Sequence, residues 1–252
     1  QGFLFGRNSV SGAVNIVTRA PSEAPEGFVR LVAGEYDTLE GYAGWSGPVA
    51  ADRVLARIGI AREQRGGVSE NRFDGRELDD LERTSLRART LIDLSASLSL
   101  DVSADYADIL QNTVVTGERQ TDLFDTVVAG VPLPPRNVEI NTRPFEDVEL
   151  GGLAANVSYE PGTGPRFVSV TTARALEQRR VNDSDYSPAD LLSVTYDEIF
   201  SQFSQEFRIV SPENASLRYV AGAYFLNDLA KTKRDATIGQ DLATPVPFPN
   251  GA

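Results

Sequence analysis

The sequence contains no cysteine, no histidine and no methionine in 252 residues. Without thiols and imidazoles there is no disulfide, no thiolate nucleophile and no imidazole base, so the common hydrolase triads cannot be assembled from this chain. No thioether, thiolate or imidazole is present to bind a soft metal ion, and we expect no resident metal or cofactor. The missing methionine indicates that residue 1 is not a translation start, so we expect a piece of a longer protein.

Long apolar runs and clustered positive charge are also lacking. No run approaches the roughly 18 apolar residues that a membrane-spanning helix needs, and residues 1–18 have neither the basic start nor the apolar stretch of a secretory signal. The formal net charge is −12, which argues against a nucleic-acid surface because phosphate binding needs a basic face. With 41% hydrophobic residues, the chain fits neither a disordered protein nor a helical membrane protein.

What the sequence does contain is alternation of polar and apolar residues. The segments SLDVSADYA (99–107), TSLRARTLIDL (84–94) and DRVLARIGIAR (52–62) place small or branched apolar side chains on one side and charged or hydroxyl side chains on the other. A period of two residues is typical of β-strands with two different faces. Less strict alternation recurs along the chain, and we expect about nine strands.

The connections between these strands differ in length. Short, turn-like connections are expected at 47–52, 95–97, 160–165 and 211–216, and long polar ones at 65–82, 111–146, 180–200 and from 229 onward. Because successive connections of an up-and-down meander lie at opposite ends of the sheet, this order places the long loops on one rim. Unequal rims are typical of outer-membrane barrels. The predicted fold is all-β: a partial antiparallel up-and-down transmembrane barrel, which forms one curved sheet with two unpaired edges.

Two other classes of protein remain open on this pattern. A soluble or surface-anchored β-sandwich, such as a glycan-binding adhesin, would show the same alternation, and acidic pairs such as Glu146 and Glu149 could serve a carboxylate-dependent hydrolase. The aromatic residues are equally ambiguous between a membrane-interface girdle and ordinary strand formers. They are Tyr42, Trp45, Tyr106, Tyr159, Tyr219, Tyr224 and Phe225.

The opening segment QGFLFGRNSVSGAVNIVT closely resembles the end of the plug domain of TonB-dependent receptors of the bacterial outer membrane. Ser11 departs from that pattern, since a second glycine is common there. The segments GEYDTLEGYAGWSGPV (34–49) and SQFSQEFRIVSPENASLRYVAGAYFL (201–226) are similar to strand pairs of the same family. The structural or gating residues that the plug-end resemblance implies are Gly2, Phe5, Gly6, Arg7, Asn8, Gly12 and Asn15.

This resemblance implies three regions: residues 1–20 as the end of a plug domain, 21–26 as a linker, and 27–252 as the first, incomplete part of the barrel. It further implies a non-enzymatic receptor in the bacterial outer membrane that takes up a scarce nutrient, such as a ferric siderophore. Its expected partners are the TonB energy-transducing complex, reached through plug residues outside this sequence, and outer-membrane lipid. Loops 111–146 and 180–200 are candidates for contacting the nutrient.

Overall fold

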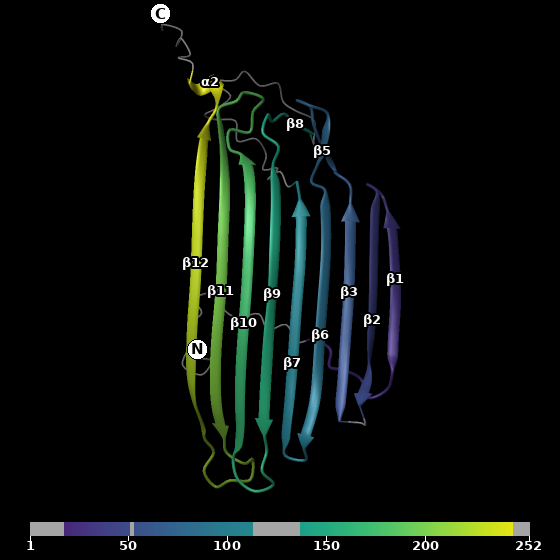
Figure 1. The fold of residues 1–252 in the computed structure, drawn as a ribbon, viewed down its shortest axis with the longest axis vertical. Helices are drawn as coiled ribbons and strands as arrows, with labels where there is room; N and C mark the ends of the chain where they lie inside the picture. The colour runs from purple at the N-terminus through teal and green to yellow at the C-terminus, as the bar shows by residue number, and fades with distance from the viewer. Residues whose placement is uncertain (1–17, 51–52, 113–136, 244–252) are drawn as a thin grey trace, which may run out of the picture.

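In the computed structural model, residues 18–50, 53–112 and 137–243 are described. Nine long strands form one antiparallel sheet in the order β1-β2-β3-β6-β7-β9-β10-β11-β12 (Figure 1). These strands are β1 (Glu26–Gly34), β2 (Thr38–Ala50), β3 (Val54–Arg65), β6 (Leu81–Ser95), β7 (Leu98–Gln111), β9 (Phe145–Tyr159), β10 (Arg166–Asp183), β11 (Leu192–Val210) and β12 (Val220–Ile238). The described part of the chain holds no helix that is both long and apolar enough to cross a membrane.

A second, small sheet lies at one end of the large one. Strands β4 (Ser69–Asn71) and β5 (Arg76–Leu78) form a hairpin, and β8 (Asn137–Val138) pairs in parallel with β4. A short helix, α2 (Gln240–Ala243), follows β12 at the same end (Figure 1). The two sheets are not layers of a sandwich, so the alternative of a β-sandwich module is wrong for the fold.

The two faces of the large sheet differ in chemistry. Residues paired across strands lie on the same face, and neighbours along a strand lie on opposite faces. Arg57 pairs with Arg89, and Arg89 with Ser103. We call their side of the sheet the polar face. Leu86 pairs with Tyr106 on the other side, which we call the apolar face. The alternation predicted from the sequence is therefore confirmed.

The large sheet has almost no interior of its own. Among the described residues, the only large hydrophobic side chains that are buried are Leu78 and Ile140, both in the loops at one rim. On the apolar face, by contrast, Val29 and Leu31 are each 75% exposed and Leu153 is 61% exposed. A sheet that leaves such side chains uncovered needs an apolar surrounding to be stable.

The connections confirm the prediction of unequal rims. Turns of a few residues join β2 to β3 and β6 to β7 at one end, which we call the short-turn rim, whereas the longer excursions lie at the opposite long-loop rim (Figure 1). The expected loops at 180–200 and from 229 onward are wrong in extent, because β10 runs to Asp183, β11 begins at Leu192 and β12 reaches Ile238. In these extensions both faces carry polar side chains, so the apolar period ends although strand pairing continues.

Candidate functional site

The polar face is lined by arginines that are paired with carboxylates on neighbouring strands. Arg89 binds Asp101 through a fork of two hydrogen bonds, with Nε and Nη2 at 3.0 and 2.7 Å from the two carboxylate oxygens. Arg83 pairs with Glu63 nearer the long-loop rim. Such fixed forks hold charged groups in place without a hydrophobic core. The polar face is thus a structured, hydrophilic wall.

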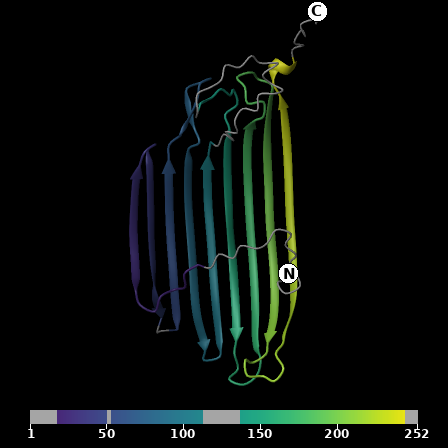
Figure 2. The ribbon, with the colours of Figure 1, turned by 180° about the vertical axis from the view of Figure 1, so that it is seen from behind.

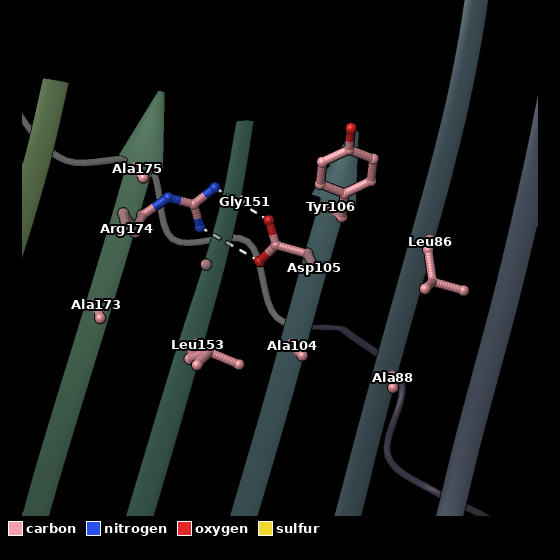
Figure 3. Close-up of a pocket in the computed structure, with 11 residues that line it drawn as sticks. Leu86, Ala88, Ala104, Asp105, Tyr106, Gly151, Leu153, Ala173, Arg174 and Ala175 are labelled. Carbon is pink, nitrogen blue, oxygen red and sulfur yellow. Dashed lines mark hydrogen bonds and ion pairs between the residues drawn. The ribbon is translucent and has the colours of Figure 1, made fainter. Parts of the chain in front are cut away.

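A glycine makes room for one of these pairs. Arg174 on β10 reaches across β9 to Asp105 on β7, with Nη1 and Nη2 at 3.3 and 3.1 Å from its carboxylate oxygens (Figure 3). Between them lies Gly152, which pairs with both residues in register. A Cβ atom at Gly152 would lie 3.0 Å from Nη1 and 3.2 Å from Cγ of Arg174. The absence of a side chain there lets the ion pair span two strands.

A short extended segment, residues 18–25, lies against the polar face. Nη1 of Arg89 donates to the carbonyl of Thr18 at 2.9 Å, and Nε of Arg57 donates to the carbonyl of Ala20 at 3.2 Å. The amide of Ser22 donates to Oγ of Ser46 at 2.8 Å. Figure 2 views the sheet from this side and shows the purple trace passing in front of the first strands. The polar face therefore encloses a chain segment.

The apolar face carries an uncharged belt. On β7 its outward residues run from Leu98 to Tyr106, a rise of about 26 Å along the strand at roughly 3.3 Å per residue. Between the rows of these two residues, no outward position of the described strands holds a charged side chain. The next row toward the long-loop rim holds Asp108, Glu149 and Glu177. This row of charged side chains marks the edge of the belt on the side of the long-loop rim.

Three polar residues inside the belt satisfy one another. Oγ1 of Thr171 donates to Oε1 of Gln205 at 2.6 Å, and Nε2 of Gln205 donates to Oγ of Ser169 at 2.9 Å. In a medium without water, hydroxyl and amide groups need such partners. This small network makes the belt compatible with hydrocarbon although it is not wholly apolar.

Small side chains leave a shallow hollow in the belt. Its walls are Leu86, Tyr106 and Leu153, and its floor is formed by alanines and Gly151 on β6, β7, β9 and β10 (Figure 3). A Cβ atom at Gly151 would lie 3.1 Å from the carbonyl oxygen of Asp105. Asp105, Gly152 and Arg174 also border the hollow, but the charged side chains of Asp105 and Arg174 pair with each other on the polar face.

Aromatic residues divide between the two faces. Trp45, Tyr159 and Phe225 lie on the apolar face, together with Tyr106. Tyr42 lies instead on the polar face, where its hydroxyl is 2.8 Å from carboxylate oxygens of both Glu40 and Glu63. Tyr106 and Tyr159 stand in the two edge rows of the belt, as a girdle requires, whereas Phe225 lies in its middle row with Gln205, Thr171 and Ala155. Tyr224, which pairs with Glu206, is also on the polar face.

The loops of the long-loop rim are joined to one another, and we call this assembly the rim cap (residues 66–80, 137–144 and 184–191). The side chain of Asn71 donates to the carbonyl of Ile140 at 2.8 Å and accepts from its amide at 3.1 Å. Leu78 and Ile140, each 2% exposed, pack beside Val138. The amide of Asn141 donates to the carbonyl of Ser187 at 3.3 Å. Three separate excursions of the chain thus form one unit.

Asp183 occupies an unusual electrostatic position at the edge of the rim cap, beyond the belt. It is 3% exposed, and burial raises the pKa of its carboxyl to about 6, with a smaller contribution from the nearby Asp185. Backbone amides, including those of Thr142 and Tyr186, donate to it and oppose that rise. The carboxyl changes its charge close to the pH of mildly acidic surroundings.

No model of a known protein family matches the sequence, but solved structures do. The ferric yersiniabactin uptake receptor FyuA from Yersinia pestis is 17% identical, with a TM-score of 0.75 over 94% of this chain and 36% of the receptor. The ferripyoverdine receptor of the outer membrane of Pseudomonas aeruginosa, bound to ferripyoverdine, is 14% identical, with a TM-score of 0.65 over 88% of this chain and 31% of that one. The siderophore receptor PiuA from Acinetobacter baumannii is 12% identical, with a TM-score of 0.65 over 93% and 34% of the two chains.

These similarities define the fold of the chain. The sheet has the architecture of a bacterial outer-membrane receptor barrel. More narrowly, its neighbours are TonB-dependent siderophore receptors, and the chain has the fold of part of their barrel. The sequence resemblance to this family is thereby confirmed at the level of the fold. The chain spans about a third of the length of the receptors it matches.

The residues expected from the plug-end motif lie outside the described part of the chain. They are Gly2, Phe5, Gly6, Arg7, Asn8, Gly12 and Asn15. The contacts of residues 18–25 with Ser46, Arg57 and Arg89 were not expected. Alternation places the two arginines on the polar side, but nothing in the sequence indicates which carbonyls they bind. Ser46 lies within the family-like segment 34–49, but nothing in that segment indicates that its hydroxyl accepts the amide of Ser22.

Proposed function

We propose that this chain is part of a TonB-dependent receptor that takes up a scarce nutrient across the bacterial outer membrane. The nutrient is a ferric siderophore or a similar complex, and the work of transport is supplied from the inner membrane. No catalysis is involved. The nutrient is recognised by polar contacts on the inner wall and the rim cap, and its passage follows displacement of the plug.

The observation that carries this proposal is the arrangement of the two faces. The apolar face has an uncharged belt with largely exposed leucines and valines, whereas the polar face carries paired charges and binds a chain segment. A water-soluble sheet would be stable only with the opposite exposure. Closed strand pairing is the one non-helical way across a bilayer, and the fold neighbours are receptor barrels.

The domain organisation follows the same proposal. Residues 1–20 end the plug, 21–26 link it to the wall, and 27–252 form the first part of the barrel. The position of residues 18–25 on the polar face supports this division, because a plug must enter the barrel from inside. The partners are the TonB complex, engaged through plug residues outside this sequence, and the lipid around the belt. A nucleic-acid partner does not fit a net charge of −12.

Deletion of the intact gene tests this function. Cells without the gene are compared with wild-type cells for growth and for uptake of radioactive iron as hydroxamate, catecholate and citrate complexes, with cobalamin and sugars as further sources. We expect loss of uptake for one iron complex, restored by the gene and abolished by a protonophore. Unchanged uptake of every source, or recovery of the protein in the soluble fraction, would contradict the proposal.

A further inference from the structure

The segment of residues 18–25 crosses the first strands one after another. Thr18 is held from β6, Ala20 from β3 and Ser22 from β2, before the chain enters β1 at Glu26. Each of these three contacts is made to a backbone atom of the segment, and the side chain of Arg19 adds an ion pair with Glu26 on β1 at 3.3 Å. The segment is therefore fixed at several points along its course, and the three backbone contacts are distributed over three strands.

The groups that hold the segment are themselves held. Arg89 is oriented by its two hydrogen bonds to Asp101, which leaves Nη1 aimed at the carbonyl of Thr18. Arg57 donates through Nη2 to Glu26 at 2.6 Å and through Nε to Ala20. Side chains that are already fixed lose little further freedom when they bind a ligand or a neighbouring segment. The docking surface is thus preorganised.

Burial adds a third argument. Ser46, which accepts the amide of Ser22, is only 1% exposed, and Pro21 is buried. Lifting the segment off the wall would expose Pro21 and leave Ser46 and two guanidinium groups with fewer partners. Polar groups that lose their partners in a confined site are costly. Separating this segment from the wall therefore costs more free energy than moving a chain segment that makes no such contacts.

We propose that Arg57, Arg89 and Ser46 are positioning residues that keep residues 18–22 docked on the barrel wall throughout transport. This inference rests on the proposed function and concerns how the plug moves within it. The displacement that opens a path for the nutrient ends at Thr18, so the docked segment acts as a fixed boundary. The force from the inner membrane then rearranges plug residues that precede this boundary.

A disulfide lock tests the inference. Residues 1–252 contain no cysteine, and the Ser22 amide lies 2.8 Å from Oγ of Ser46. With any cysteine elsewhere in the receptor replaced by serine, Ser22→Cys with Ser46→Cys places one defined pair across the contact. In the full-length receptor, uptake of radioactive iron as hydroxamate, catecholate and citrate complexes is measured before and after oxidation. The two single variants serve as controls. We expect uptake by the oxidised pair to stay within twofold of the reduced pair.

A tenfold or greater loss of uptake on oxidation, with binding of the iron complex retained, would overturn the inference while leaving the proposed function intact. Absence of binding and uptake of every complex by wild-type receptor would overturn the proposed function and this inference with it. The two failures are therefore distinguishable in one experiment.

A second measurement does not depend on the identity of the nutrient. Pro21→Cys in the full-length receptor is treated with a small maleimide in living cells, with and without a protonophore. We expect slow labelling that is equal in both conditions, and at least tenfold faster labelling when Arg57→Ala and Arg89→Ala are added. Labelling that rises severalfold in energised cells would show that the segment leaves the wall, and would refute its permanent docking.

Discussion

Replacing Ala155 with arginine tests the orientation of the sheet in the bilayer. Ala155 lies on the apolar face of β9, paired with Val102 on β7 and Thr171 on β10. Its neighbour Ala154 lies on the polar face, paired with Ser103 and Thr172. The two positions share a residue type, a strand and a depth, so Ala154→Arg is a matched control.

The expected magnitude follows from the position of Ala155 in the belt. It lies midway between the rows of Gly151 and Tyr159, about 13 Å along the strand from either edge at roughly 3.3 Å per residue. With a strand tilt of about 40°, this is about 10 Å in depth from each edge. An arginine facing lipid at the midplane costs about 2–4 kcal/mol. This corresponds to roughly 30- to 1,000-fold in the folding equilibrium.

The assay is reversible folding of the full-length receptor into lipid vesicles, followed by urea titration and by mobility on gels with and without heating. We expect Ala155→Arg to lower the free energy of unfolding by about 2–4 kcal/mol, and Ala154→Arg to change it by less than about 1 kcal/mol because its side chain enters a hydrated space. Equal effects, or a larger effect at Ala154, would refute the assignment of the apolar face to lipid.

Three further changes probe the polar face and the rim cap. Gly152→Val should displace the Arg174 guanidinium from its carboxylate and cost about 1 kcal/mol in urea titration, since the pair is partly exposed. Asn71→Ala should leave the backbone groups of Ile140 without partners and cost about 2–4 kcal/mol locally, measured as faster hydrogen exchange at residues 137–142. The carboxyl of Asp183 binds its proton more tightly when folded, so stability of the rim cap, followed by hydrogen exchange, should fall as pH rises from about 4 to about 6.

Each of these changes has a matched control. Gly162→Ala lies in a turn where a Cβ atom meets nothing within 4 Å, so it should have no comparable effect. Glu70→Ala removes an exposed side chain beside Asn71 on β4 and should leave exchange at residues 137–142 unchanged. Asp183→Asn should abolish the pH dependence between about 4 and about 6. If that dependence persists in Asp183→Asn, another group is responsible for it.

The sheet could be predicted from the sequence because its energetics are local. Val102 and Ala104 lie on the apolar face and Ser103 on the polar face. Because the two faces need different side chains, the sequence alternates with a period of two residues. The period is present only within the belt. Beyond it, Arg179 and Asp197 sit on paired outward positions, where water surrounds both faces and no apolar residue is required. The strand extensions therefore could not be predicted from alternation.

The rim cap could not be predicted for a different reason. Asn71 and Ile140 are separated by 69 positions in the sequence, and their contact depends on the sheet bringing two loops to the same rim. No local pattern distinguishes Asn71 from an ordinary turn asparagine. The same holds for Arg89 and Thr18, which are 71 positions apart. Polar contacts between residues far apart in the sequence can be recognised only once the fold is known.

In the receptor proposed above, the two faces of the sheet impose opposite requirements on movement, and this would link the fold to transport. The belt on the apolar face fixes the wall in lipid, because every outward residue from Leu98 to Tyr106 would lose its favourable surroundings if the wall shifted by a few ångströms. The polar face is hydrated, so single exposed hydrogen bonds to it can be replaced by water at modest cost, whereas the contacts of residues 18–22 are several and partly buried. A rigid wall with exchangeable inner contacts allows an inner segment to move without loss of the barrel. The hydrogen bonds from Ser46, Arg57 and Arg89 favour a fixed position for residues 18–22. The boundary between the moving and the fixed parts of the chain then lies at Thr18.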